Sequence, residues 1–276
     1  PNIKVNRLDK NDQIYMTKRE KYNAVLDLVK SRNEINQPIL IGTTSVENSI
    51  KISDLLKREN LKHNILNAKN HMSEAKIIEE AGMPGNITIS TNMAGRGTDI
   101  KLGNGDDNLK KEAIDAGGLL VIGTERHESR RIDNQLRGRS GRQGDPGSTI
   151  FFISLQDELM RIFGGDSIDG MLKKLGLKEN ESIDHPWINK AMERAQKKVE
   201  SRNFDIRKTL IKFDDVMNDQ RQVIFAQRLR VLKENDISGI LIDFFEEILK
   251  ELEISLNNYK KSNDEKYLIE IKGIIG

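Results

Sequence analysis

The chain has 276 residues, in which 45 lysines and arginines nearly balance 43 aspartates and glutamates to give a net charge of +2. This balance argues against a general attraction of the whole chain to nucleic acid or anionic lipid. The absence of cysteine excludes disulfides, thiolate metal sites and cysteine nucleophiles. No apolar run approaches the roughly 20 residues that span a bilayer, and the given sequence does not open on a signal-peptide pattern. Because the chain begins at Pro1, we expect it to be a piece of a longer protein.

The first part of the chain, up to about Ile153, alternates short apolar runs with amphipathic stretches. The runs are often β-branched and are bounded by glycine or polar residues, which predicts buried strands at 38–42, 64–67, 87–90, 119–123 and 149–153. Helix-like stretches at 46–59, 73–81 and 128–137 lie between them. This alternation predicts an α/β fold with a parallel sheet covered by helices on both faces. Ligands of such sheets bind beyond the carboxyl ends of the strands.

The later part of the chain has a different, helical character. After Pro186, no glycine or proline occurs before Gly239, and Asp184 and Pro186 are suitable helix-start residues. Apolar residues recur at spacings of three, four or seven from Ile188 to Ile224, which predicts one long helix of roughly 60 Å. The tail at 236–276 is again helical in pattern and too short for an independent core. We therefore expect a small, truncated helical domain there.

The most informative stretch is the glycine-rich sequence Q-L-R-G-R-S-G-R-Q-G-D at 135–145. Arg139 and Arg142 lie three residues apart beside glycines that allow close backbone packing. Each guanidinium is a planar, permanently charged fork that matches phosphate oxygens, so this loop suits charge stabilisation on a transferring phosphoryl group. A solvated basic turn with surface ion pairs is the alternative interpretation.

A second glycine-rich stretch, S-T-N-M-A-G-R-G-T-D-I at 90–100, follows another predicted strand. Gly95 and Gly97 allow a tight turn, Arg96 can reach an anion, and Asp99 can accept hydrogen bonds from ribose hydroxyls. Taken alone, the stretch is also compatible with an ordinary turn in which Asp99 caps a helix. Because both stretches follow strands of the same predicted sheet, we expect them to converge at one edge.

The order of these motifs resembles motifs IV, V and VI of superfamily 2 helicase-type motors, with G-T-T-S-V-E at 42–47 as the first of the three. The sequence around and between these motifs is similar to that of the SecA family of bacterial preprotein translocase ATPases. This similarity runs from Pro1 through at least Arg228 and includes non-catalytic stretches at 66–69, 125–134, 196–200, 202–204 and 213–218.

The resemblance implies a RecA-like second nucleotide-binding domain at 1–186, a long scaffold helix at 187–228, and the truncated start of a helical wing at 229–276. It also implies an ATP-driven motor that pushes preproteins through the Sec translocon, with ATP bound between this lobe and a first lobe. By the same resemblance, Arg139 and Arg142 are the catalytic arginines at the γ-phosphate. The nucleotide-binding positions are Asp99, Arg96, Gly95, Gly97 and Gln143.

The phosphate loop G-x-x-x-x-G-K-[ST] and a D-E-A-D-like acidic box do not occur in the sequence. The family carries these elements, which hold the phosphates and Mg²⁺, on the first lobe. We therefore expect the piece alone to be inactive as an ATPase. The four histidines at positions 63, 71, 127 and 185 show no metal-site spacing, so no metal or zinc site is predicted. His127, which starts a helix-like stretch, is interpreted as structural.

The implied partners are the first nucleotide-binding lobe, the SecYEG translocon and preproteins, with no specific nucleic acid. The implied location is the cytoplasm and the inner face of the plasma membrane, with peripheral attachment. One alternative is the second lobe of a superfamily 2 nucleic-acid helicase. Leu136 stands where many helicases carry arginine, and aromatic residues make up only 5% of the chain, both of which disfavour it. A further alternative is a non-enzymatic module that docks through its helices.

Overall fold

The computed structural model describes residues 3–66, 71–91, 97–163, 186–233, 236–262 and 264–275, without the side chains of 71–74, 162–163, 186–189 and 191. Contacts divide the chain into two compact units, Pro1–Phe204 and Asp205–Gly276. The first unit holds the sheet, and the elements described in the second unit are all helices.

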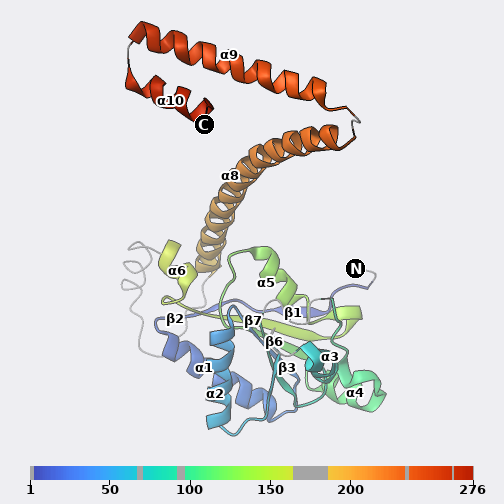
Figure 1. Ribbon diagram of the computed structural model, residues 1–276. Helices are drawn as coiled ribbons and strands as arrows, with labels where there is room; N and C mark the ends of the chain where they lie inside the picture. Colours follow the sequence, from blue (N-terminus) through green and yellow to red (C-terminus); the bar gives the residue numbers. More distant parts are fainter. Residues whose placement is uncertain are drawn as a thin grey trace. The chain divides into compact units, whose positions relative to one another are not determined.

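The first unit is built on a parallel sheet with the strand order β1-β7-β6-β3-β5-β4, and β2 also pairs with β7 (Figure 1). Every strand pairing in it is parallel. The strands are β1 (Arg7–Asp9), β2 (Gln13–Tyr15), β3 (Ile39–Thr43), β4 (Asn64–Leu66), β5 (Ile87–Thr91), β6 (Leu119–Gly123) and β7 (Gly147–Ser154). The five strands that the sequence predicts are β3 to β7, and all of them are confirmed.

Helices cover both faces of this sheet. They are α1 (Lys18–Asn33), α2 (Val46–Arg58), α3 (His71–Glu80), α4 (Asp107–Asp115), α5 (Arg130–Arg137) and α6 (Glu158–Phe163), with short 3₁₀ turns at Leu102–Gly105 and Arg142–Gly144. Successive side chains of a strand point to opposite faces. In β3, Ile39 and Ile41 accordingly join the core under α1 and α2, whereas Leu40 joins the core under α3 and α4. The RecA-like α/β fold is therefore present as predicted.

Helix α8 (Pro186–Lys233) is 48 residues long, which confirms the predicted long helix. Its beginning belongs to the first unit, where Met192 and Val199 are buried against Ile14, Phe151 and Leu159. The remainder of α8, from Asp205, belongs to the second unit.

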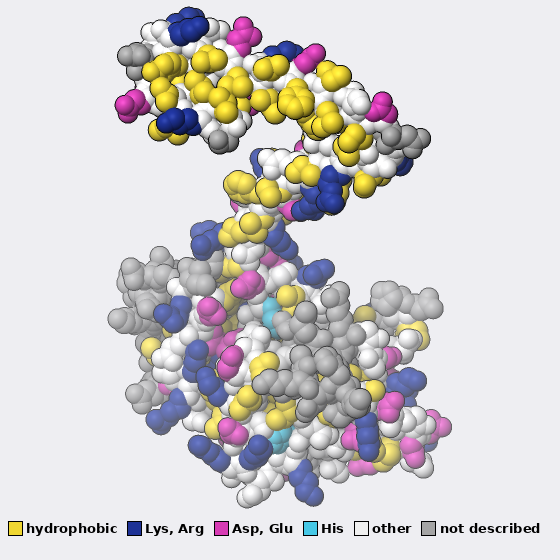
Figure 2. Space-filling view, in the orientation of Figure 1, with side chains coloured by type: hydrophobic (Ala, Val, Ile, Leu, Met, Phe, Trp, Pro, Cys, Tyr) yellow, Lys and Arg dark blue, Asp and Glu magenta, His cyan; other side chains and the backbone are white. Residues whose placement is uncertain are grey.

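The second unit also contains α9 (Ser238–Ser262) and α10 (Glu265–Ile275), which pack against each other. Figure 2 shows many apolar side chains on their surface, and Phe245, Leu249 and Ile269 are each more than 60% exposed. Among the described residues, no helix is both long and apolar enough to cross a membrane. The predicted helical tail is confirmed.

Candidate nucleotide-binding site

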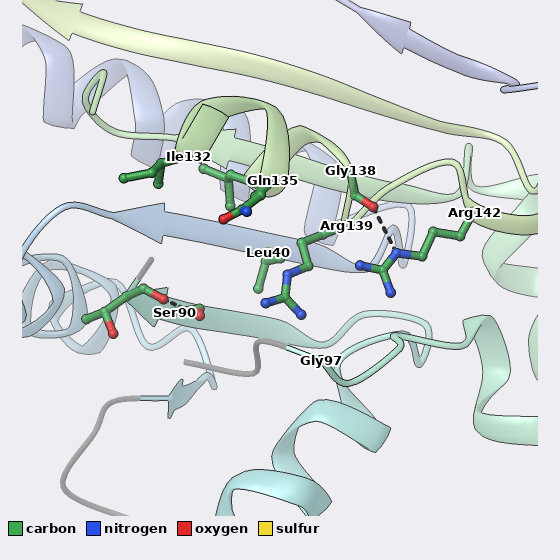
Figure 3. Close-up of a pocket in the computed structure, with 10 residues that line it drawn as sticks. Leu40, Ser90, Gly97, Ile132, Gln135, Gly138, Arg139 and Arg142 are labelled. Atoms are coloured by element: carbon green, nitrogen blue, oxygen red, sulfur yellow. Dashed lines mark hydrogen bonds between the residues drawn. The ribbon is translucent and has the colours of Figure 1, made fainter. Parts of the chain in front are cut away.

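A cavity of about 270 Å³ lies beside the carboxyl end of β5 (Figure 3). One wall is the end of β5 and the loop that follows it, and the opposite wall is α5 and the loop after α5. The lining residues are Leu40, Ser90, Thr91, Gly97, Ile132, Gln135, Leu136, Gly138, Arg139 and Arg142. The cavity therefore lies between the two glycine-rich stretches that the sequence singles out.

Arg142 bridges these two stretches. Its Nη1 atom donates to Asp99 Oδ1 at 2.5 Å, and its Nε atom donates to the carbonyl oxygen of Gly138 at 2.8 Å. The side chains of Arg142 and Asp99 are 35% and 41% exposed, so the ion pair remains accessible to solvent. The expected convergence of the two stretches is thus present in the structure.

Arg139 lies on the same side of the cavity as Arg142. Its Nη1 atom donates to the carbonyl oxygen of Thr98 at 3.2 Å, which places a second guanidinium against the loop after β5. Figure 3 shows the guanidinium groups of Arg139 and Arg142 directed toward the same space beside Gly97. Two permanent positive charges at one opening favour an anionic ligand.

The loop at 138–145, which carries Arg139 and Arg142 and is called the arginine loop below, has a tightly constrained backbone. Gly141, Gln143 and Gly144 have positive φ angles of 71°, 52° and 82°. The loop is fixed to the sheet by Ser140, whose hydroxyl donates to the carbonyl oxygen of Leu119 at 2.7 Å. A Cβ atom on Gly147 would lie 2.0 Å from Ser140 Oγ, so only glycine allows β7 to approach the loop this closely.

The structure brings several of the predicted site residues to the cavity. Arg139, Arg142 and Gly97 line the cavity, and Asp99 contacts it through Arg142. Gln143 lies in the 3₁₀ turn after Gly141 and is not among the lining residues. Gly95 and Arg96 lie outside the described residues. The sequence did not single out Gln135, Ser90 and Thr91 as lining residues, although each stands inside one of the two quoted motifs.

A buried network of charged side chains, formed by Asp12, Arg126, Asp133 and Arg137, holds α5 in place. Arg126 holds Asp12 with two nitrogens, at 2.9 Å from Nε and 2.7 Å from Nη2, and donates to Asp133 at 3.1 Å. Arg137, the last residue of α5, donates to Thr149 Oγ1 at 2.9 Å. The guanidinium carbons of both arginines lie over the ring of Phe151, 4.3 and 4.8 Å from its centroid. These contacts fix the end of α5 from which the arginine loop starts.

The pKa values of the two buried carboxyl groups of this network, Asp12 and Asp133, change in opposite directions. Desolvation raises the pKa of Asp12 even though Arg126 beside it opposes the change. Desolvation also acts on Asp133, but hydrogen bonds from His127 and the charge of Arg126 outweigh it and lower the pKa of Asp133. Asp133 is therefore held as a carboxylate that accepts hydrogen bonds.

His127 contributes to this network and not to the cavity between the glycine-rich loops. Its Nδ1 atom lies 2.8 Å from Asp133 Oδ1, and its backbone N–H donates to the same oxygen at 3.0 Å. This position agrees with the structural role expected for His127. Within the described parts of the chain, no group of three or more His, Asp or Glu side chains is placed to hold a metal ion.

A second buried cluster lies around Lys21, whose side chain is fully buried. Its Nζ atom is 2.6 Å from Asp157 Oδ1 and 3.4 Å from Glu125 Oε1. Burial raises the pKa of Asp157 to about 6, although Lys21 opposes the change. Glu125 also accepts hydrogen bonds from Thr44 and Asn48, so this cluster ties the G-T-T-S-V-E stretch to α1.

Solved structures with a similar fold include a DEAD-box protein and two helicase domains, all at low sequence identity. The Escherichia coli DEAD-box protein SrmB, in a complex with regulator of ribonuclease activity A, is 16% identical with a TM-score of 0.43 over 64% of this chain and 88% of its own. Domain 2 of the DEAD-box helicase Mss116p, bound to an RNA duplex, is 18% identical with a TM-score of 0.39 over 56% of each chain. The Hef helicase domain of Pyrococcus furiosus is 19% identical with a TM-score of 0.38, and the match covers 53% of this chain and 28% of that one.

Family models account for almost the whole chain. The model of the SecA P-loop domain matches residues 4–114 and 105–180, and the model of the SecA wing and scaffold domain matches residues 182–275. The first match contains both glycine-rich loops and the cavity between them, and the second contains α8, α9 and α10. The chain therefore belongs to the SecA family.

Proposed function

We propose that this chain forms the arginine-bearing half of an ATP site in a motor that pushes preproteins through the Sec translocon. The observation that carries the proposal is the pair of guanidinium groups of Arg139 and Arg142 at one cavity beside the loop after β5. Membership of the SecA family supports the transport role. Residues 1–186 would be the second nucleotide-binding domain, 187–228 the scaffold helix, and 229–276 the start of the wing.

The arginines would act on the charge that develops on the transferring phosphoryl group. The Gly138 carbonyl holds Arg142 through Nε, and Asp99 holds it through Nη1. Nη1 would turn to a phosphate when Asp99 exchanges this contact for the ligand. Arg139, three residues earlier in the same loop, lines the same cavity. Preorganised positive groups of this kind stabilise a phosphoryl-transfer transition state because they need no reorientation during the reaction.

The other predicted positions would bind the rest of the nucleotide. Asp99 would accept hydrogen bonds from the ribose hydroxyls, after exchanging its contact with Arg142 for the ligand. Gly97 has a φ angle of 90°, and within the part of the chain that the structure describes no atom lies within 4 Å of an added Cβ. Gly95, Arg96 and Gln143 would complete the binding loops.

A first lobe would supply the phosphate loop and the acidic residues that hold Mg²⁺, because the sequence contains neither motif. The chain alone would then bind ATP weakly and not hydrolyse it. Further partners would be SecYEG and preproteins, and the motor would work in the cytoplasm, attached peripherally to the inner face of the plasma membrane.

The direct test is ATP turnover by the full-length protein with Arg139→Ala or Arg142→Ala. Loss of one preorganised donor lowers kcat by about 10²- to 10³-fold in comparable sites, and we expect a loss of this order in both variants. Arg131→Ala is the control, because Arg131 is an exposed arginine of α5, the helix before this loop, and does not line the cavity. Near-normal turnover in both cavity variants would overturn the assignment of these arginines.

A further inference from the structure

The side chain of Gln196 joins α8 to α5 inside the first unit. Its Nε2 atom donates to Asp133 Oδ2 at 2.6 Å and to the carbonyl oxygen of His127 at 2.8 Å. An amide nitrogen carries two hydrogens, so it can make both bonds at once. Gln196 is only 2% exposed, and water therefore cannot replace these bonds without opening the contact between the helices.

Asp133, the acceptor of one of these bonds, lies in the middle of α5 and is 1% exposed. Its Oδ1 atom accepts from the backbone and ring of His127, and its Oδ2 atom accepts from Arg126 and Gln196. If Gln196 is removed, a buried carboxylate oxygen loses one of two donors. Such a loss is costly in the interior of a protein, so the position of α5 depends on α8.

Two further contacts join the same face of α8 to α5 and the loop before it. Glu200 Oε1 accepts from the backbone N–H of Arg130, the first residue of α5, at 2.8 Å. A carboxylate is favourable there because the first N–H groups of a helix have no partner within the helix. Asn203 Nδ2 donates to Glu128 Oε2 at 2.9 Å. Residues 196, 200 and 203 are spaced by four and three, so they share one face of α8.

The opposite end of α5 leads directly to the cavity. The helix has only 8 residues, and Gly138 and Arg139 follow its last residue, Arg137. The carbonyl oxygen of Gly138 holds Arg142 through its Nε atom. Because α5 is a single short helix, we expect a displacement at its α8 end to reach the loop that carries Arg139 and Arg142.

We infer that Gln196 is a positioning residue that couples α8 to Arg139 and Arg142. The inference rests on the proposed function, because it assumes that these arginines bind the phosphates. Movement of α8 then aligns or misaligns both arginines through Asp133. Linked equilibria are reciprocal, so binding of a phosphate must in turn change the stability of the contact between α8 and α5.

The test is hydrogen exchange of the full-length protein with and without a non-hydrolysable ATP analogue. In the wild-type protein we expect the analogue to slow exchange both in the loop at 138–143 and in α8 at 196–204. In Gln196→Leu the response of the loop should persist, whereas the response of α8 should be lost. Gln222→Leu is the matched control, because Gln222 is an exposed glutamine of the same helix.

A purely structural role of Gln196 gives a different result. The variant would then raise exchange in α8 by the same factor with and without analogue, and the nucleotide-dependent change would survive. That result, or a wild-type α8 that does not respond to the analogue while the loop does, would overturn the coupling but leave the proposed function intact. If neither segment of the wild-type protein responds, the proposed function fails as well.

Glu200→Ala tests the same coupling at a half-buried position, where the variant is expected to fold even if Gln196→Leu does not. It should reduce the response of α8 without abolishing that of the loop. In both variants we expect kcat for ATP to fall by about fivefold or more, the lower end of typical coupling between sites, with a smaller change in KM. An unchanged α8 response in Glu200→Ala would contradict the proposal.

Discussion

Nη1 of Arg142 lies 2.5 Å from Oδ1 of Asp99, so the loop after α5 is bonded to the loop after β5. Both partners belong to the set proposed to bind the nucleotide. Because the two side chains are 35% and 41% exposed, water competes for the pair and it contributes little to stability. An ion pair of this kind can be exchanged for ligand contacts at low cost, which suits a site that must open and close.

The first prediction concerns the ribose contact of Asp99. In the full-length protein, Asp99→Ala should abolish the preference for ATP over 2′,3′-dideoxy-ATP, because the acceptor for the ribose hydroxyls is lost. A hydrogen bond to a charged group contributes about 1.5–3 kcal/mol, so the wild-type preference should be about tenfold or more. Equilibrium binding of both nucleotides measures it. Asp27→Ala, at an exposed aspartate of α1, should keep the preference. A preference that survives Asp99→Ala would exclude the ribose role.

The second prediction concerns the close contact between β7 and the arginine loop. An added Cβ on Gly147 would lie 2.0 Å from Ser140 Oγ and 2.9 Å from the carbonyl oxygen of Leu119. Gly147→Ala should therefore lower the free energy of unfolding by about 1–3 kcal/mol, as other overpacked sites do. Urea unfolding measures this change. Gly239→Ala is the control, because no atom of the described residues lies within 4 Å of its added Cβ. Equal stabilities of the two variants would refute the steric account.

The third prediction concerns the buried carboxyl of Asp157, whose pKa is raised by burial from 3.8 to about 6. Between these values the folded state holds a proton that the unfolded state has lost, so this group makes stability fall as the pH rises from about 4 to 6. Asp157→Asn removes this dependence. The difference in unfolding free energy, wild type minus variant, should therefore decrease by at most about 3 kcal/mol between pH 4 and pH 7.

Urea unfolding of both proteins at several pH values measures this difference. Lys21 and Glu125 are the charged groups that face Asp157, and both are unchanged in the variant. A difference that is independent of pH, or that increases with pH, would contradict the raised pKa of Asp157.

Much of the fold was predictable because buried parallel strands leave a clear sequence pattern. Residues 39–43 and 119–123 are buried at every position in the structure, which explains their uninterrupted apolar runs. Strands β1 and β2 were not predicted. They have three residues each at the edge of the sheet, and β1, with the sequence R-L-D, is mostly exposed. Helices α1, α4 and α6 were not predicted either, and α1 buries a lysine, Lys21, in its apolar stripe.

The candidate site was predictable in part for a different reason. Glycines and arginines at fixed spacing mark the two loops, and the parallel topology brings them to one edge of the sheet. The support of these loops was not predictable, because two of its members lie far from their partners in the sequence. Only tertiary packing brings Asp12 to Arg126 and Gln196 to Asp133. A single polar residue in a sequence does not indicate which residue, 60 or 100 positions away, will be its hydrogen-bond partner.

The most direct test of the central claim is the affinity of the full-length protein for a non-hydrolysable ATP analogue compared with ADP. If Arg139 and Arg142 bind the γ-phosphate, alanine at either position should weaken analogue binding by about tenfold or more, the value of one charge-assisted hydrogen bond. The affinity for ADP, which lacks that phosphate, should change by less than about threefold, or roughly 0.6 kcal/mol. Equal losses for both nucleotides, or no loss for either, would contradict the claim that these two arginines sense the γ-phosphate.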